Sequence, residues 1–525
     1  MIKHLKSALS VTALMTLAAC SVEPAYHRPT VDVPAAFKEA YLSPAQAHKW
    51  MVAHPAEASG RGEWWMVFND PTLDRLERQA LAANQNLKAA AARVKEARAQ
   101  LGVARSALFP HLDGGFGPLR QRASNASLGL PADASNPPTT LWRAQFGISY
   151  EADLFGRVSS ATHAAAADTQ QSEALFQSVR LALQADVAQA YFHLRRLDAD
   201  TDLYRKTLAL RSAALDLTQR QYAAGDISDL NVARARTELA STQSEALGIA
   251  RERAVAEHAL AILLGKPPAD FSFRPDSLKR TTVTVPAGVP SSLLQRRPDI
   301  AAAERAMAAA NARIGLAKSA FFPRLDVTGS FGYESSALGD LLKWSSRTFL
   351  LGPLVGTALS LPIFDGGQRG AQLEKARATY DEDVANYRQT VLVAFQQVED
   401  SLANLRLLGG QMKAQDEAVR AAARAATMLH TQYREGSISY LDVIDGDRVL
   451  LQQRRASVAL DEQRVDSTVA LIRALGGGWG PVPNSDDTSA TARNTKSEST
   501  AGTDTSAGKH PVIPHSPGQS GSVTS

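Results

Sequence analysis

The sequence lacks the features that mark several common protein classes. After its first 20 residues, no stretch holds the roughly 18 consecutive apolar residues of a membrane helix. Its 57 basic and 53 acidic residues are interspersed without a basic block, so the net charge of +4 does not indicate nucleic-acid binding. The 11 histidines show no metal-ligand spacing, and no glycine-rich phosphate loop is present. The sequence therefore predicts no helical membrane bundle, no nucleic-acid partner, no cofactor and no enzyme.

The single cysteine, Cys20, directly follows a secretory signal. Basic residues within the first six positions precede an apolar run from Leu9 to Leu17, which is too short to span a membrane. The order Leu-Ala-Ala-Cys that ends at Cys20 resembles the lipobox of bacterial lipoproteins. This resemblance implies a signal peptide over 1–19, a diacylglycerol on the Cys20 thiol and an acyl chain on its new amino group. Ser21 is not the aspartate associated with inner-membrane retention, so the outer membrane is expected; the alternative is a buried or accidental cysteine.

The rest of the chain contains two copies of one pattern. QYAAGDISDLNV at 221–232 matches QYREGSISYLDV at 432–443 with an offset of 211 residues, and GVARSALFPHLD at 102–113 matches GLAKSAFFPRLD at 315–326 with an offset of 213. Each copy reads helix, strand, loop, strand, long helix, turn and helix. We therefore expect five regions after the signal peptide: a lipidated segment over 20–63, a first repeat over 64–268, a linker over 269–290, a second repeat over 291–476 and a disordered tail over 477–525.

Strands with alternating polarity interrupt the helical pattern in each copy. They are predicted from His111 and over 141–154 in the first copy, and over 324–333 and 350–364 in the second. Each strand is long enough to cross a bilayer when tilted. Four strands cannot close a barrel, however, and lipid does not tolerate an open sheet edge. Strands that span a membrane therefore require several copies of the chain.

Long helices are predicted around these strands. One is expected from about Asp70 to Leu108, and another from Arg157 to Tyr222, where the absence of proline allows a helix of roughly 100 Å. Apolar residues recur every seven positions from Ile444 to Ile472, and they step by three and four from Leu373 to Leu405. Such stripes are typical of coiled coils and also of monomeric bundles. The strands' need for partners favours an oligomer.

Seven stretches stand in order along the chain: WWMVFNDPTLDRLERQAL (64–81), ARVKEARAQLGVARSALFP (92–110), YEADLFGRV (150–158), RRPDIAAAER (296–305), SAFFPRLD (319–326), LPIFDGGQR (361–369) and YREGSISYLDVIDGDR (433–448). Together with the lipobox they resemble the TolC-like outer-membrane factor family, and within it the NodT-like lipoproteins of RND-type efflux systems. The match runs from Cys20 to about Leu475.

This resemblance implies an α+β membrane protein that forms a homotrimer. Three chains contribute four strands each to one transmembrane β-barrel in the outer membrane of a Gram-negative bacterium, continuous with a coiled-coil α-helical barrel in the periplasm. The chain has an internal two-fold repeat. The strand face that carries Trp142, Phe146, Ile148 and Tyr150 is expected to meet lipid, and the face that carries Arg143, Gln145, Ser149 and Glu151 is expected to meet the lumen.

The implied function is the outer-membrane channel of a tripartite efflux pump. It is a passive exit duct for small molecules such as drugs or other toxic compounds, which an inner-membrane RND-type transporter and a periplasmic adaptor deliver. Two alternatives stay open. One is the outer-membrane channel of an ABC-type system that secretes polypeptides, and the other is a non-conducting, lipid-anchored periplasmic scaffold. The lipobox and the RRPDI stretch resemble small-molecule efflux members more closely.

The resemblance places a periplasmic gate after the second matched turn. The residues that close the pore in family members fall here at Leu441, Asp442 and Asp445, and three-fold symmetry makes each aspartate a ring of carboxylates. Tyr433 is expected to hydrogen-bond across the helix pair in the closed state. Asn231 replaces a gate-linking aspartate of some relatives, so the residue pairs that lock the gate stay open. The structural alternative is that Asp442 and Asp445 only complement a helix N-terminus.

The two matched turns are expected at the periplasmic end of the long helices. Gly225 and Gly436 would take positive φ at the helix ends. With Ile227 and Ile438 they form the tips that are expected to dock on the adaptor.

Overall fold

The computed structural model describes residues 21–39, 63–276, 278, 280, 283, 293–351 and 359–477. The chain divides into two units, Met1–Trp479 and Gly480–Ser525, and every described residue belongs to the first. The predicted signal peptide, the lipidation site at Cys20 and nearly all of the predicted tail therefore lie outside the described residues.

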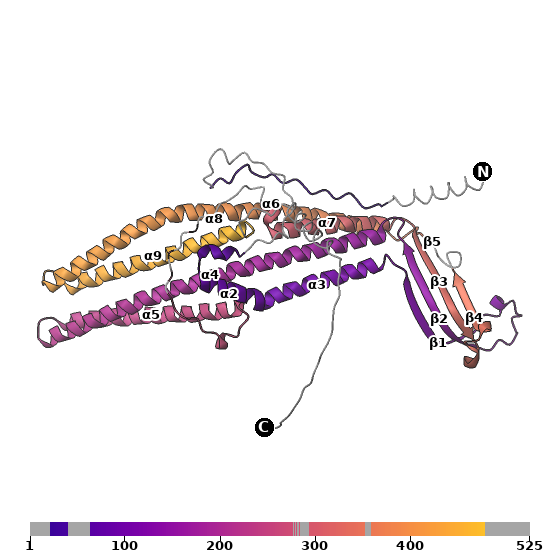
Figure 1. The fold of residues 1–525 in the computed structure, drawn as a ribbon, viewed down its shortest axis with the longest axis horizontal. Helices are drawn as coiled ribbons and strands as arrows, with labels where there is room; N and C mark the ends of the chain where they lie inside the picture. Colours follow the sequence, from indigo (N-terminus) through magenta and orange to yellow (C-terminus); the bar gives the residue numbers. More distant parts are fainter. Residues whose placement is uncertain are drawn as a thin grey trace, which may run out of the picture. The chain divides into compact units, whose positions relative to one another are not determined.

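The two halves of the described chain contain matching elements in the same order (Figure 1). α3 and α7 have 22 residues each, α4 and α8 have 67 each, and α5 and α9 have 35 each. The elements are α2 (Pro71–Ala83), α3 (Gln85–Ser106), β1 (His111–Gln121), β2 (Thr139–Ala152), α4 (Arg157–Ala223), α5 (Asp229–Leu263), α6 (Leu293–Arg296), α7 (Pro298–Ser319), β3 (Arg324–Ser335), β4 (Arg347–Leu351), β5 (Leu359–Ser360), α8 (Gln368–Arg434) and α9 (Tyr440–Ala474), with a 3₁₀ turn at Trp64–Phe68.

The single helix predicted from Asp70 to Leu108 is wrong, because Asn84 divides it into α2 and α3. Asn84 has φ −60° and ψ 129°, outside the helical region, and its Oδ1 accepts from the Leu87 amide at 3.0 Å as the N-cap of α3. Its Nδ2 donates to the carbonyl oxygen of Leu263, the last residue of α5, at 2.9 Å. The break thus lets one side chain cap two helices.

The strands form one antiparallel sheet in the order β1-β2-β3-β4, and β5 also pairs with β3. Register pairs include Phe116 with Ala144 and Phe146 with Phe331. The last strand departs from the predicted 350–364, because β4 already begins at Arg347 and residues 352–358 lie outside the described chain. Within the described strands, β1 and β4 each pair on one side only and form the two edges of the sheet.

The helices next to the sheet repeat this order. α3 packs on α4, α4 on α7 and α7 on α8, so α3 and α8 are the edge helices beside the edge strands. In Figure 1 the strands lie beyond one end of these helices, and the turns that join α4 to α5 and α8 to α9 lie at the other end. Over the described residues, no helix combines the length and the apolarity needed to cross a membrane.

The long helices use the predicted stripes for packing. α4 runs without a break for its 67 residues, which corresponds to roughly 100 Å. Its first turn is fixed by Asp153, whose carboxylate accepts from the amides of Val158 at 3.0 Å and Ser159 at 2.7 Å. In α9, Ile444, Val465 and Ile472 of the heptad stripe are buried.

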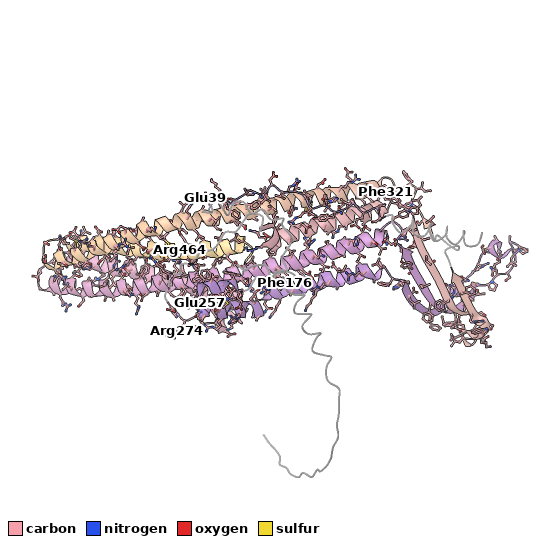
Figure 2. The ribbon with its side chains drawn as sticks, turned by 45° about the horizontal axis from the view of Figure 1, so that its top comes forward. Glu39, Phe176, Glu257, Arg274, Phe321 and Arg464 are labelled. Carbon is pink, nitrogen blue, oxygen red and sulfur yellow. The ribbon has the colours of Figure 1, made fainter. Side chains whose placement is uncertain are left out.

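An extended N-terminal segment, residues 21–39, lies along the helices. Glu23 accepts from Ser160 on α4 at 2.8 Å, the Tyr26 hydroxyl donates to Glu304 on α7 at 2.8 Å, and Arg28 donates to Tyr387 on α8 at 3.0 Å. Further on, Glu39 forms an ion pair with Arg406 of α8 at 2.6 Å, and Figure 2 shows it beside that helix. This segment therefore fastens three neighbouring helices together.

The main hydrophobic core lies where α2, α4 and the C-terminal ends of α5 and α9 meet. Its buried members include Trp65, Leu73, Leu194, Leu260 and Ile472. Because both hairpins, α4–α5 and α8–α9, end in this core, it fixes their bases, while their turns lie at the far end of the helices.

Candidate functional site

The two matched turns close their helices in the same way. Gly225 and Gly436 have φ of +84° and +75°, as the sequence predicts, and no atom would contact a Cβ at either position within 4 Å. The backbone conformation, and not crowding, therefore requires glycine there. The Asp226 amide donates to the Gln221 carbonyl at 2.9 Å, and the Ser437 amide to the Gln432 carbonyl at 3.0 Å, as in the Schellman motif. Ile227 and Ile438 lie half-buried in these turns.

Asp442 caps the first turn of α9. Its Oδ2 accepts from the amide of Ser439 at 3.0 Å and from the hydroxyl of Ser439 at 2.7 Å, which together with the Ser439 side chain forms a capping box. The corresponding cap of α5, Ser228, makes no such side-chain bond, and Asn231 stands at the third position of that helix. The aspartate of the second turn thus has a local structural role that the first turn lacks.

The other two predicted gate residues lie on the exposed side of α9. Leu441 is 40% exposed, and the Asp445 side chain is 61% exposed and lies 3.6 Å from Arg448. Between them Val443 and Ile444 are buried in the hairpin. Leu441 and Asp445 therefore share a helix face that is free to meet another copy of the chain.

Tyr433 lies near the end of α8 and connects the two hairpins. Its hydroxyl donates to Gln221 Oε1 on α4 at 3.3 Å, and its ring lies 5.5 Å from that of Tyr440. Burial raises the pKa of Tyr433 above its ordinary value and that of Tyr440 to about 12. Both hydroxyls thus keep their protons at neutral pH and can donate.

Sequence reasoning missed a stronger link between the hairpins, at Glu238 on α5. Its buried carboxylate forms an ion pair with Arg211 on α4 at 3.0 Å and accepts hydrogen bonds from Arg448 on α9, with Arg448 Nε at 3.1 Å. Near the turns, an ion pair between Arg448 and Glu238 thus joins the hairpins, and Arg196 on α4 with Glu462 on α9, at 2.8 Å, joins them nearer their bases. Glu238 lies on the packed stripe of α5 with Ala235 and Thr242, three and four residues away, and this spacing could indicate a buried position but not its partner.

The sheet has two chemically different faces, as its alternation predicts. Apolar side chains on one face are exposed: Leu112 and Phe116 on β1, Phe146 and Ile148 on β2, Val327 and Phe331 on β3, and Phe349 on β4. Phe146 stacks on Phe331 at 5.6 Å. The opposite face carries ion pairs, among them Arg143 with Glu334 at 2.5 Å and Arg324 with Asp326 at 2.7 Å. An apolar face this exposed needs an apolar environment.

No group of three or more His, Cys, Asp or Glu side chains among the described residues could hold a metal ion. Arg297 of the RRPD stretch has a structural role, because it donates to Gln397 of α8 at 2.8 Å and to the Ala474 carbonyl at the end of α9 at 3.0 Å. The Asp299 carboxylate accepts hydrogen bonds from two nitrogens of the same guanidinium, Nε and Nη2.

The sequence matches the family described as outer membrane efflux protein over residues 76–266 and 289–477. It is 34% identical over 479 residues to the toluene efflux pump outer membrane protein TtgF of Pseudomonas putida, which covers 90% of this chain and 96% of that protein. It is 31% identical over 468 residues to the cation efflux system protein CusC of Escherichia coli, which covers 89% of this chain and 97% of that protein.

Among solved structures, the outer-membrane channel OprN is similar, with a TM-score of 0.77 and 29% sequence identity over 88% of this chain and 100% of that one. The family match covers both halves of the chain, and the relatives align over nearly their whole length. The chain belongs to the outer membrane efflux protein family, which acts in the outer membrane of Gram-negative bacteria.

Proposed function

We propose that three copies of this efflux protein form one channel through the outer membrane. The observation that carries the proposal is the sheet, whose apolar face is exposed and whose edge strands β1 and β4 each pair on one side only. In lipid an unpaired edge leaves backbone groups unsatisfied, at a cost of several kcal/mol for each group. Pairing β1 of one copy with β4 of the next removes these edges. Because β4 and β5 both pair antiparallel with β3, at different residues, we count them as one strand position, and three copies of four positions give a closed barrel of a common size.

The helices support the same assembly. Since α3 and α8 are the edge helices beside β1 and β4, one rotation between copies closes both the sheet and the helix layer. The equal lengths of α3 and α7, α4 and α8, and α5 and α9 support an internal two-fold repeat of residues 64–268 and 291–476. In this assembly the polar face of the sheet lines a water-filled duct, and the helices extend the duct into the periplasm.

The duct serves small solutes delivered by partners. TtgF is named as part of a toluene efflux pump and CusC as part of a cation efflux system, and toluene and metal cations are both small solutes. We infer that an inner-membrane RND-type transporter supplies the energy and that a periplasmic adaptor docks on the tips around Gly225, Ile227, Gly436 and Ile438. The duct is passive and needs no cofactor. We further propose a covalent lipid on Cys20.

The hairpin tips form the periplasmic gate. Leu441 and Asp445 are exposed on α9 and meet their counterparts around the three-fold axis, where three carboxylates favour cations and repel anions. Asp442 contributes charge to this region while it caps α9. Tyr433 with Gln221, and Arg448 with Glu238, hold the two hairpins of each copy together in the closed state.

Single-channel recording in planar bilayers tests the proposal. The purified full-length protein is expected to migrate as a trimer after chemical crosslinking and to conduct ions in discrete steps. A correctly folded trimer without conductance would support the scaffold alternative instead. The partners are tested in cells with a photo-crosslinking residue at Ile438: capture of an adaptor from an RND-type system supports the efflux assignment, and capture of an ABC-system adaptor supports polypeptide secretion.

A further inference from the structure

The lipid-facing side of the sheet has an uneven distribution of charge. Its outward positions on the described strands are apolar, aromatic or uncharged except at two places, Arg120 on β1 and Arg347 on β4. No Asp or Glu occupies an outward position of these strands, because Asp113, Asp326 and Glu334 alternate to the polar face. The face therefore carries positive charge without any compensating carboxylate.

Both arginines lie at the same end of the sheet, away from the helices. Arg120 pairs in register with Thr140, at the loop end of β1 and β2. Arg347 is the first residue of β4 and pairs with Tyr333. At the other end of this face, next to the helices, the outward residues of the described strands are uncharged. They are Leu112, Ile148, Tyr150, Ala152, Leu325 and Val327.

Aromatic side chains accompany these arginines. The Arg347 guanidinium lies over the ring of Trp344, which is 73% exposed, and Arg347 Nε donates to the Trp344 carbonyl at 2.9 Å. This holds the guanidinium at the rim of the apolar face. The Arg120 side chain makes no hydrogen bond or ion pair with any residue of the described structure and is exposed. Tryptophan and arginine side by side at the end of an apolar band fit the boundary between acyl chains and headgroups.

We infer that Arg120 and Arg347 bind the phosphate groups of lipid A, the membrane anchor of lipopolysaccharide. The inference rests on the proposed trimeric barrel, in which the helices lie in the periplasm and the loop end of the sheet faces the outer leaflet. The outer leaflet is where lipid A presents its phosphates. The planar guanidinium donates two parallel hydrogen bonds to a phosphate, and these bonds are strengthened by the opposite charges. A headgroup without an anionic group cannot form such charge-assisted bonds.

The positions of the two arginines also predict where the lipid binds. Arg120 and Arg347 lie on the two edge strands, so they are on opposite edges of one copy. Closing the barrel places β1 of one copy beside β4 of the next. Each of the three seams then carries Arg120 from one copy and Arg347 from its neighbour, and one lipid A molecule links two copies.

Binding is tested with the full-length trimer in phosphatidylethanolamine vesicles that contain lipid A. The lipid retained by the purified trimer is counted by native mass spectrometry across a titration. For Arg120→Gln with Arg347→Gln, we expect the apparent affinity for lipid A to fall at least about tenfold, as for the loss of a charged hydrogen-bond partner. Arg120→Lys with Arg347→Lys keeps the charge but loses the two parallel hydrogen bonds, so its affinity is expected to lie between those of the wild type and the double glutamine variant. Arg220→Gln removes an exposed arginine of α4 and is the control, which is expected to bind as the wild type does.

Two further arms identify the ligand. Dephosphorylated lipid A is expected to bind the wild type no better than it binds the double glutamine variant. Equal retention of lipid A by wild type and double variant overturns the inference, and equally tight retention of phosphatidylglycerol overturns the assignment to lipid A. Conductance is recorded on the same preparations, because a conducting double variant leaves the proposed channel intact whatever its lipid binding. A wild-type trimer that binds lipid A without conducting would contradict the channel and not the lipid site.

Discussion

The Glu238 carboxylate on α5 accepts two hydrogen bonds from the Arg448 guanidinium on α9, with Arg448 Nε 3.1 Å from Glu238 Oε2. The pair joins the α4–α5 hairpin to the α8–α9 hairpin one turn beyond Asp445. Glu238 is buried, while the Arg448 side chain is 56% exposed. Separating the hairpins would therefore leave the glutamate, and not the arginine, as the costly unpaired group, although Arg211 would still contact it.

Removing the charge of Glu238 is expected to favour the open gate. Glu238→Gln keeps the side-chain shape but loses its charge-assisted bonds, which contribute about 1.5–3 kcal/mol for a charged partner. The fraction of time spent in high-conductance states should rise at least about tenfold in single-channel recordings. Glu417→Gln, which removes an exposed carboxylate paired within α8, serves as the control. An identical open fraction in the two variants would exclude the ion pair from the closed-state lock.

The exposed face of α9 leads to a second prediction. Asp445→Ala is expected to raise single-channel conductance, and Leu441→Ala in addition is expected to raise it further, because both side chains narrow the proposed pore. Asp445→Ala should also reduce the preference for cations, measured as the reversal potential in a salt gradient. Asp442→Asn is the comparison, since an amide oxygen can still accept from Ser439 and keep α9 capped. Unchanged conductance of Asp445→Ala would remove this residue from the gate.

The sequence predicted the elements that local pattern determines. The helix expected from Arg157 to Tyr222 is α4, Arg157–Ala223, and the strand expected over 324–333 is β3, Arg324–Ser335. In both cases the signals are local in the sequence. Gly156 and Gly225 flank α4, while Pro323 and the alternating polarity after it indicate β3. The positive φ of Gly225 was predictable for the same reason, since it follows from the helix end.

Features that depend on distant contacts escaped prediction. Asn84 interrupts an apolar period that continues on both sides. The hydrogen bond that accompanies this break goes to the carbonyl of Leu263, 179 residues away. Glu238 and Arg448 are separated by 210 residues, so no periodicity connects them. The gate residues stay predictions, because their proposed contacts lie between copies of the chain.

The side chain of Asn84 is expected to stabilise the fold through the bond that its Nδ2 donates as well as through the capping bond that its Oδ1 accepts. Asn84→Asp keeps the oxygen that caps α3 but cannot donate to the Leu263 carbonyl, which would then face a carboxylate. Leaving this carbonyl without a partner should lower the free energy of unfolding by about 1–3 kcal/mol. The measurement is denaturant unfolding of the trimer in detergent, followed by circular dichroism. Equal stability of wild type and Asn84→Asp would show that the capping bond alone matters.

The same reasoning applies in the second half to Arg297, which holds the Ala474 carbonyl at the end of α9. Arg297→Lys keeps a positive charge but loses the fork that reaches Gln397, Asp299 and this carbonyl together. We expect a loss of stability at least as large as that of Asn84→Asp, measured in the same way. A lysine variant as stable as the wild type would show that charge, and not geometry, holds the end of α9.

Glu77 on α2 leads to a prediction about pH. Its side chain is fully buried, and neither carboxylate oxygen has a hydrogen-bond partner in the described structure. Burial, with a smaller effect of Asp74, raises its pKa from 4.5 to about 9, so the native state binds this proton more tightly than the unfolded chain does. The stability that this group contributes is therefore complete below pH 4.5 and is lost as the pH rises towards 9. At pH 7.5 the loss relative to low pH is at most about 4 kcal/mol, at about 1.36 kcal/mol per pH unit.

Glu77→Gln removes the proton equilibrium while it keeps the side-chain size. The free energy of unfolding of the variant is expected to be close to the wild-type value at pH 5 and larger than the wild-type value at pH 7.5. At pH 7.5 the unfolded wild type is stabilised by releasing the Glu77 proton, and a glutamine has no such proton. Denaturant unfolding of both proteins at several pH values measures the difference, and Glu96→Gln on the exposed side of α3 controls for a surface charge. If Glu77→Gln is no more stable than the wild type at pH 7.5, the buried carboxyl must have a partner or a water that lowers its pKa.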